Sequence, residues 1–465
     1  MNILSNNTKE EKTLKSIYCF MKEYSVGKHL KKVNAYKNKG IPVMSIFIYL
    51  IQLVFTKKSM YMNILNGTHN GGFSKDSVYR LLNSPFINWS AFLLNIAICV
   101  INGKISTLTS KERINTLIVD DTLYSRSRSK NVELLAKVYD HSAKATNKYR
   151  KGFQQLTMAW SDGVTLIPIM FRHMSSEEKR NRYNEINSKI DKRSCGYKAR
   201  KQALSSKPKV MIDMLIQASK AGILAKHVLF DCWFSFPSTI IEVCKLKMNV
   251  VARVKNTPKI KYLLDSEKKT LSQIYTSAKK RRGKSKYLLS VAIKLYNKDN
   301  ETYDARIVYI RDRNNKKNWI ALISTDPNLS EEEIIKLYSR RWDIEVFFKI
   351  CKSYLNLAKE FRGLSYDAII AHTTVVMTRY IILAVEKRQV EDPRTLGEIF
   401  YLCYDEIAEI QFSEAFGFIL SLLRDVLEEV LFLTVEQVNL LIDVFISKLP
   451  EHFKEKMLPN ESIVI

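Results

Sequence analysis

The chain has 465 residues, of which 46% are hydrophobic, and its 74 Lys and Arg outnumber its 47 Asp and Glu to give a formal net charge of +27. This hydrophobic content excludes a wholly disordered protein, and the sequence has neither the Walker-type loop nor the G-x-G-x-x-G motif of nucleotide-binding enzymes. The seven cysteines form no C-x-x-C pair, which excludes a disulfide framework and a zinc ribbon and favours a cytoplasmic protein.

Residues 1–110 are predicted to form a helical N-terminal region. Between its apolar runs, Ser74 can cap a short helix that carries Lys75, Tyr79 and Arg80. This arrangement is typical of a helix-turn-helix that reads DNA, and a short capped helix with no such role is the alternative. We therefore predict a DNA-binding region here.

The two longest apolar stretches are too short or too polar to predict a membrane span. Residues 41–55 contain Pro42 and Gln52, and residues 368–385 contain His372 and Arg379. A spanning helix needs roughly 20 consecutive apolar residues. We therefore expect no membrane partner.

Strands are predicted from about residue 115 onward. The apolar run 116–119 leads into Asp120-Asp121-Thr122, and runs 154–160 and 164–171 flank a Ser-Asp-Gly turn that is typical of a hairpin. A helix over 210–220 precedes the strand 227–230, which ends at Asp231, and another strand follows at 249–254. Residues 111–255 are therefore predicted to be the first part of an α/β core.

The second half of the chain is predicted to contain a β-rich insertion and then helices. Residues 256–328 alternate basic loops with the strand-like runs 287–295, 303–310 and 319–324. One long helix is predicted from about Ser330 within the segment 329–363, because Glu331, Glu332 and Glu333 suit a helical first turn. The remainder, 364–465, is apolar, acidic and helical in pattern, and we expect it to form dimer contacts.

The positive charge is concentrated in the middle of the chain. Residues 111–363 hold 52 Lys and Arg against 26 Asp and Glu, whereas residues 364–465 hold 8 against 17. Basic side chains gain affinity for a polyanion when they release its condensed counterions. The pattern favours binding to nucleic acid over the alternative of a merely soluble basic protein.

Three acidic residues are candidates for the chemistry. Asp120 and Asp231 follow predicted strands, and Glu345 lies on the predicted helix, where Arg341 and Glu345 have the spacing of neighbours on one helical face. Carboxylates held on rigid elements can bind two Mg²⁺ ions for phosphoryl transfer. The alternative is that the aspartates form turns and that Arg341 and Glu345 are an ordinary ion pair.

The same residues resemble a known family. Tyr338, Arg341, Glu345 and Lys352 match the signature Tyr-x(2)-Arg-x(3)-Glu-x(6)-Lys of the DDE-type insertion-sequence transposases of family four. Asp120-Asp121-Thr122 matches the family's Asp-x-Thr strand end, and Asp231 matches its second strand-end aspartate. The resemblance covers roughly residues 115–365.

The resemblance implies a ribonuclease-H-like catalytic core with a β-rich insertion, flanked by helical N- and C-terminal regions. It implies that Asp120, Asp231 and Glu345 are catalytic and hold Mg²⁺ or Mn²⁺, with two ions expected, and that Tyr338, Arg341 and Lys352 bind DNA. The partners it implies are double-stranded DNA, as terminal inverted repeats and target, and a second copy of the chain in a synaptic homodimer. Asp121 remains an alternative to Asp120 as the first ligand.

The predicted function is metal-dependent cleavage at transposon ends followed by strand transfer into target DNA. Two alternatives remain. The chain is a related metal nuclease without strand transfer, or it is a basic DNA-binding protein without catalysis. Two further aromatic residues carry weaker hypotheses: Trp319 is expected to be a buried strand residue, and Trp233 has no assigned role.

Overall fold

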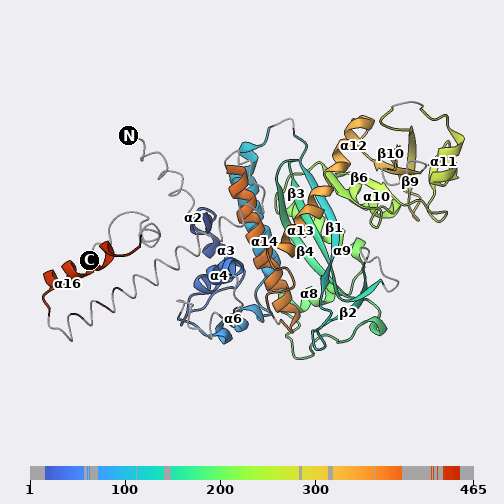
Figure 1. Cartoon of the computed structure of the whole chain (residues 1–465). Coiled ribbons are helices and arrows are strands. Elements are labelled where there is room, and N and C mark those ends of the chain that lie inside the picture. Colours follow the sequence, from blue (N-terminus) through green and yellow to red (C-terminus); the bar gives the residue numbers. More distant parts are fainter. Residues whose placement is uncertain are drawn as a thin grey trace, which may run out of the picture.

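One mixed β-sheet organises the described part of this computed structural model (Figure 1). The described residues are 16–56, 60, 62, 72–110, 113–140, 148–281, 285–312, 318–361, 363–389, 420, 423, 427 and 433–450. Within them, eleven strands form the sheet in the order β2-β3-β1-β5-β6-β11-β10-β9-β7-β8, with β4 paired to β3. The strands are β1 (Thr116–Ser125), β2 (Ala136–Tyr139), β3 (Tyr149–Ser161), β4 (Leu166–Met174), β5 (His227–Phe230), β6 (Asn249–Val254), β7 (Tyr262–Leu264), β8 (Glu267–Lys269), β9 (Leu289–Tyr296), β10 (Thr302–Arg311) and β11 (Trp319–Ser324).

The core of this sheet has the ribonuclease-H-like arrangement. β4, β3 and β1 are successive antiparallel neighbours, and β5 and β6 then continue the sheet parallel to β1. The helix pair α8 and α9 lies between β4 and β5 in the chain, which gives the parallel strands the long connection that they require. The predicted α/β class with this core is confirmed.

The strands after residue 256 continue the same sheet. β11 pairs antiparallel with β6, and β10, β9 and β7 follow outward from it. The strand runs predicted for this part of the chain correspond to β9, β10 and β11. We refer to residues 256–328 as the insertion; it is joined to the core by backbone hydrogen bonds and is drawn at the right of Figure 1.

The first strand differs from its prediction. The expected strand ended at Asp120, but β1 continues to Ser125 because β3 offers it backbone partners along its whole length, from Thr116 opposite Ser161 to Ser125 opposite Gly152. Only the pairing with β5 stops early, at Val119 beside Phe230. Asp120 therefore lies within β1, directly after the last residue of β1 that pairs with β5.

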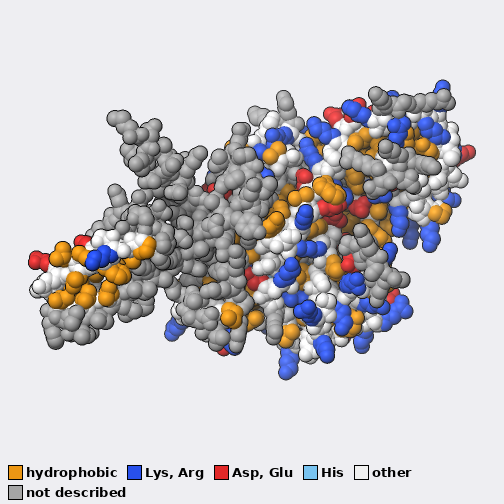
Figure 2. All heavy atoms as spheres, in the orientation of Figure 1, with side chains coloured by type: hydrophobic (Ala, Val, Ile, Leu, Met, Phe, Trp, Pro, Cys, Tyr) orange, Lys and Arg blue, Asp and Glu red, His pale blue; other side chains and the backbone are white. Residues whose placement is uncertain are grey.

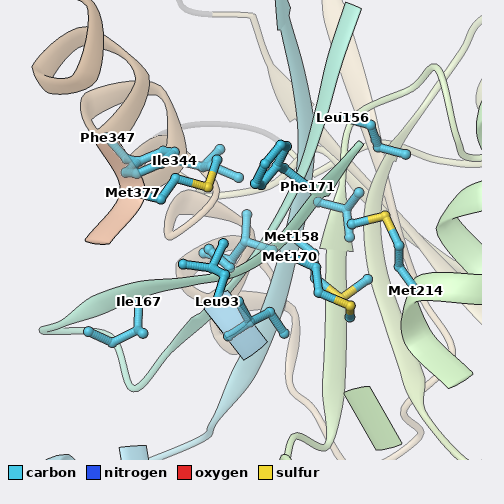
Figure 3. Packing of buried hydrophobic residues seen from close by; sticks show 14 of the residues in the cluster. Leu93, Leu156, Met158, Ile167, Met170, Phe171, Met214, Ile344, Phe347 and Met377 are labelled. Atoms are coloured by element: carbon cyan, nitrogen blue, oxygen red, sulfur yellow. The ribbon is translucent and has the colours of Figure 1, made fainter. Parts of the chain in front are cut away.

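Helices cover both faces of the core sheet. The described α-helices, of which α11 lies in the insertion and α16 lies away from the sheet, are α2 (Ser16–Glu23), α3 (Val26–Lys32), α4 (Val43–Gln52), α6 (Lys75–Leu82), α7 (Trp89–Val100), α8 (Cys195–Ala203), α9 (Lys207–Lys220), α10 (Pro237–Lys245), α11 (Leu271–Ser277), α12 (Glu331–Ser339), α13 (Trp342–Ser353), α14 (Tyr366–Gln389) and α16 (Val435–Ser447). All nine residues of β4 are buried, which requires apolar cover on both sides of that strand. Met214 of α9 lies on the opposite side of the strands from Ile344, Phe347 and Met377 of α13 and α14 (Figure 3).

Helix α14 joins the N-terminal helices to the core. It contacts α2, α4, α6 and α7 as well as β4. Its Arg379 is buried and donates to the carbonyl oxygen of Ile51 at 3.0 Å, at the end of α4, and to that of Leu355 at 3.2 Å. The first part of the predicted C-terminal region is thus a core helix. Much of the remainder of that region, including residues 390–419, lies outside the described residues, and its predicted dimer contacts stay a prediction.

Two described helical stretches are long and apolar enough to cross a membrane by length and composition alone, namely Trp89–Leu108 and Tyr366–Arg388. The second lies entirely within the protein, because its most apolar window is 100% buried against the elements just described. The first is 39% buried and packs against α14 and β4. Tyr366–Arg388 is therefore long and apolar because it is a buried core helix of this fold.

The predicted DNA-reading helix is α6. Ser74 occupies its N-cap position, and Val78, Leu81 and Leu82 are buried on its inner face. The residues directly before this segment, 63–71, lie outside the described residues. The helix-turn-helix therefore stays a prediction.

Candidate active site

Two aspartates are brought side by side where the parallel pairing of β1 and β5 ends. Val119 pairs with Phe230, and the next residue of each segment is Asp120 and Asp231. One carboxylate oxygen of Asp120, Oδ1, accepts the backbone N–H of Asp121 at 2.8 Å. The Oδ1 atom of Asp231 is buried and has no hydrogen-bond partner in the described part of the protein.

The third carboxylate comes from α13. Ile344, Phe347 and Phe348 are buried on this helix, and Glu345, at the edge of that buried face, lines the same cavity as the two aspartates. The predicted single long helix is interrupted at Arg340 and Arg341, where a turn separates α12 from α13. Arg341 is therefore the residue that caps α13 and not an interior helical residue.

The three carboxylates line one open cavity of about 550 Å³. Its basic members are Arg341, Lys349 and Lys352, and Trp233 adds an aromatic side chain that is 46% exposed. Acidic side chains gather near the centre of the face drawn in Figure 2, where the core meets the insertion, with Lys and Arg spread around them. The complete lining consists of Asp120, Asp121, Thr122, Asp231, Trp233, Arg341, Glu345, Phe348, Lys349 and Lys352.

Arg341 lies between two of the carboxylates. Its Nη1 donates to Oδ2 of Asp120 at 2.8 Å, and its Nη2 donates to Oε1 of Glu345 at 2.6 Å. The guanidinium fork thereby neutralises charge contributed by two different elements, a geometry that the single ammonium of a lysine does not reproduce.

Burial dominates the electrostatics of Asp120. Burial is the largest cause, the Arg341 guanidinium opposes it, and the nearby carboxylates of Asp121 and Asp231 add to it, so that the pKa of this carboxyl is raised to about 7. A strongly shifted carboxyl in an open cavity, with named charge partners, is typical of a functional site.

Two hydrogen bonds organise the rest of the Asp-Asp-Thr segment. Asp121 forms an ion pair through Oδ2 with Lys207, at the beginning of α9. Lys352 donates from Nζ to Oγ1 of Thr122 at 2.6 Å. Asp121 is thus engaged by a lysine from another element, as Asp120 is by Arg341, and both aspartates line the cavity, so Asp121 stays an alternative to Asp120 as the first ligand.

The donor set fits a hard divalent cation. Asp120 and Asp231 offer adjacent carboxylate oxygens, and the buried Oδ1 atom of Asp231 lacks any partner among the described residues. Within the described residues, no three His, Cys, Asp or Glu side chains form a group that could hold one ion. Arg341 lies between Asp120 and Glu345 and donates to both carboxylates.

Not every predicted residue lines the cavity. Tyr338 is half-buried behind Arg341, whose guanidinium carbon lies 5.9 Å from the centre of the tyrosine ring. Tyr338 is absent from the cavity wall, so its structural position is that of a support for Arg341. Trp319 packs inside the insertion against Tyr275 and Tyr309, with ring centres 5.1 and 4.9 Å apart respectively.

Three residues near the carboxylates were not assigned from the sequence. Lys349 lies one helical turn after Glu345, so the helical period alone could have indicated it. Trp233 is two residues after Asp231, and its position next to the strand end is the signal that was available. Lys207 carries no such signal, because only the packing of α9 brings it to Asp121.

The sheet has a ribonuclease-H-like arrangement, and it carries acidic residues at one open cavity. The chain matches the family model described as DDE superfamily endonuclease over residues 47–314, more than half of its length, and it belongs to this family. The match contains Asp120 and Asp231 and ends before Glu345.

Among solved structures, the chain is similar to a cryo-EM structure of a piggyBac transposase synaptic complex with hairpin DNA. The sequence identity is 12% and the TM-score 0.45, over 96% of this chain and 86% of the other. A comparison with curated proteins finds no match.

Proposed function

We propose that this endonuclease-family chain is a DNA transposase that cuts DNA at the ends of a mobile element and joins those ends to target DNA. The observation that carries the proposal is the single cavity in which Asp120, Asp231 and Glu345, from β1, the residue after β5 and α13, meet basic side chains. Acidic groups suit metal-assisted phosphoryl transfer, and basic groups suit the phosphate substrate. The four-residue signature from Tyr338 to Lys352 supports assignment to the transposases of family four.

The proposed reaction has two phosphoryl transfers. In the first, the oxygen of water forms a bond to phosphorus at the element's end, the bond from phosphorus to the 3′ oxygen breaks, and that oxygen leaves as a 3′-hydroxyl. In the second, this hydroxyl forms a bond to phosphorus of another strand, and the bond from that phosphorus to its own 3′ oxygen breaks. Neither transfer requires a covalent link between protein and DNA.

Members of the DDE nuclease superfamily generally use divalent metal ions. In this chain Asp120, Asp231 and Glu345 would hold them, with Mg²⁺ or Mn²⁺ as the ions and two as the expected number. Bound ions of this kind lower the pKa of water and stabilise charge that develops on phosphate oxygens.

The basic residues of the cavity have a separate role. Arg341 and Lys352 would contact the phosphates that flank the cut, and Lys349 extends the same helical face. Thr122 holds the ammonium of Lys352 in place at 2.6 Å, and Tyr338 supports Arg341 from behind. Because Arg341 contacts Asp120 and Glu345 directly, binding of a phosphate to Arg341 would also release these carboxylates for metal ions.

The substitution Glu345→Gln tests the assignment. It keeps the size of the side chain and removes its charge, so we expect metal-dependent cleavage of the element's end to fall at least about a thousandfold while DNA affinity stays within about threefold. Cleavage is measured on a labelled duplex in Mg²⁺ and in Mn²⁺, and affinity by fluorescence anisotropy.

The matched control is Asp343→Asn, an equivalent loss of one carboxylate on the same helix, two residues away and outside the cavity wall. This variant should cleave at close to the unsubstituted rate. Equal activity of the two variants would remove Glu345 from the proposed site, and loss of DNA binding by Glu345→Gln alone would show a structural role.

A metal nuclease without strand transfer is the second candidate, since the matched family is described as endonucleases. A duplex that already carries a free 3′-hydroxyl at the element's end separates the two functions. A transposase joins this end to a second duplex in Mg²⁺, whereas a simple nuclease yields no joined product.

Paired cutting of two ends requires two active sites, and we propose a homodimer that holds both ends. The acidic region 364–465 is our candidate for the dimer contact, on the basis of its charge, which is opposite to that of the rest of the chain. Because α14 is part of the core, the test is removal of residues after 389. A shortened protein that still assembles paired ends would exclude this region as the contact.

A further inference from the structure

A second cavity lies between the insertion and the first residue of α12, and its wall contains none of the active-site carboxylates. Its volume is about 400 Å³, and its wall contains the polar residues Lys279, Arg281, Tyr287, Ser290, Arg306 and Glu331. We call this group the insertion pocket. Three of these six side chains are cationic and one is acidic, so the pocket carries net positive charge.

One of the cations, Arg281, is held in position by neighbours. The guanidinium carbon of Arg281 lies 4.2 Å from the centre of the Tyr287 ring, and the backbone N–H of Arg281 donates to the carbonyl oxygen of Leu288 at 2.7 Å. Stacking on an aromatic face leaves the N–H groups at the edge of a guanidinium free to donate. Arg281 is thus oriented before any ligand binds.

The acidic residue of the pocket is already engaged. Oε1 of Glu331 accepts from Oγ of Ser290 at 2.8 Å and from Nη1 of Arg306 at 3.2 Å. Lys279 and Arg281, by contrast, form no ion pair with a carboxylate among the residues that the structure describes. The charge of Arg281 also acts on Glu331, but the three cations of the pocket outnumber this one carboxylate, and an anion would stabilise the excess positive charge.

The pocket is connected to the proposed active site by α12. Glu331 begins this helix and Arg341 follows its end, so at the helical rise the two residues are roughly 15 Å apart. One turn of duplex DNA is about 34 Å long, and this separation is therefore close to half a turn. Lys and Arg side chains are spread over the insertion in the view of Figure 2.

We propose that the insertion pocket binds a backbone phosphate of the same DNA that occupies the active-site cavity, about half a helical turn from the cut. The proposal rests on the proposed function, since it assumes a DNA substrate in the carboxylate cavity. The pocket fixes the angle at which the duplex leaves the active site, because two contacts along one duplex restrict its rotation. A free nucleotide offers the same phosphate chemistry, and the experiment separates the two sources.

The test is the double substitution Lys279→Gln with Arg281→Gln, made in the Glu345→Gln protein so that binding is measured without cutting. The probe is a fluorescein-labelled duplex of the element's end, titrated by anisotropy at several salt concentrations. Loss of one to two phosphate contacts should weaken binding about tenfold and reduce the slope of log affinity against log salt by about one to two.

The matched control is Lys294→Gln with Lys298→Gln, which removes two positive charges from exposed positions of the same insertion. It should change affinity by less than about threefold, as expected for distant screened charges. An equal effect of the two double variants would overturn the proposal, because general charge would then explain the binding.

Three further measurements separate the proposal from its alternatives. Unchanged DNA affinity in the pocket variant would also overturn the proposal. A second contradicting outcome is that the variant loses ATP binding while the salt dependence of its DNA binding stays unchanged, because the pocket would then be a nucleotide site. If the double variant unfolds early on heating, Tyr287→Leu replaces it and should lose affinity in the same direction. Failure of the unsubstituted protein to cut DNA would contradict the proposed function, and the binding measurement would still decide whether the pocket contacts DNA.

Discussion

Arg341 forms hydrogen bonds with two of the three carboxylates of the active-site cavity. It donates at 2.8 Å to Asp120 and at 2.6 Å to Glu345, and the ring of Tyr338 lies behind it. A lysine at this position would keep the charge but could not form both bonds in the geometry of the planar fork.

We therefore expect Arg341→Lys to reduce the rate of DNA cleavage by about tenfold to a hundredfold, a loss of about 1.4 to 3 kcal/mol of transition-state stabilisation. The measurement is single-turnover cleavage at saturating protein. The control is Arg340→Lys, one residue earlier, because Arg340 donates to the carbonyl oxygen of Ile114 and does not line the cavity. Equal rates for the two variants would contradict a role for the fork.

A buried histidine makes the fold sensitive to acid. His173 is fully buried, its Nε2 lies 2.8 Å from Oγ1 of Thr373, and burial lowers its pKa from the usual 6.5 to about 3. The unfolded chain therefore binds a proton between pH 6.5 and 3 that the folded chain does not bind. Stability linked to this group is complete above pH 6.5 and decreases as the pH falls through that interval.

The variant His173→Gln should have a shallower loss of stability on acidification. The free energy of unfolding in urea, measured at several pH values, should depend on pH less steeply, by up to about 1.4 kcal/mol per pH unit below pH 6.5. His29→Gln is the comparison, since that ring is only partly buried and the lowering of its pKa is a smaller effect of burial. Identical pH slopes for His173→Gln and the unsubstituted protein would contradict the assignment.

At the scale of single elements, short buried strands were the most predictable from sequence. The predicted ranges of β5, β6 and β11 agree with the structure, because each is a brief apolar run bounded by polar or turn-forming residues. The continuation of β1 past Asp120 was not predictable in this way. Its residues 120–125 are mostly polar, and the backbone of β3, which is distant in sequence, stabilises them as a strand.

The candidate site was predictable to the extent that short motifs carried it. The spacing from Arg341 to Glu345 and the two aspartates after apolar runs were visible in the sequence, and the structure brings all of them to one cavity. The break between α12 and α13 was not predicted, because the sequence there has no Gly or Pro and remains compatible with one helix. Contacts that depend on packing, such as Lys207 with Asp121, had no sequence signal.

The β1–β3 pair depends on a glycine at a close approach. A Cβ at Gly152, where φ is +159°, would lie 2.2 Å from the carbonyl oxygen of Tyr124 in the neighbouring strand. Because the obstructing atom belongs to the backbone, the two strands would have to separate.

Gly152→Ala should therefore reduce the free energy of unfolding by about 2 kcal/mol or more, measured by urea denaturation. Gly103→Ala is the matched control, since a Cβ there has no neighbour within 4 Å. A loss at position 103 as large as that at position 152 would contradict the steric explanation.

At the scale of the whole molecule, a buried ion cluster joins distant parts of the chain. Arg200 of α8 donates to Glu133 at 2.6 and 2.7 Å and to Asp367 of α14 at 2.9 and 2.7 Å, and its side chain is 0% exposed. Such a cluster is costly to break, because loss of the cation leaves buried carboxylates uncompensated.

Arg200→Leu is expected to destabilise the fold by about 3 to 5 kcal/mol in urea denaturation, in the range known for breaking a buried pair. Arg193→Leu is the control, because that side chain is 91% exposed in its pair with Asp191. It should leave the unfolding midpoint unchanged. A small effect at Arg200 would mean that Glu133 and Asp367 find other partners or become protonated.

The position of α14 near the end of the described chain also affects when the protein can fold during its synthesis. The apolar faces of α4, α6 and α7 are made early during translation, yet the helix that covers them follows every described strand in the chain. Until residues 366–389 have left the ribosome, the parts of those faces that α14 covers remain exposed, which favours aggregation of the newly made polypeptide. We therefore expect a chain that ends before this helix to aggregate.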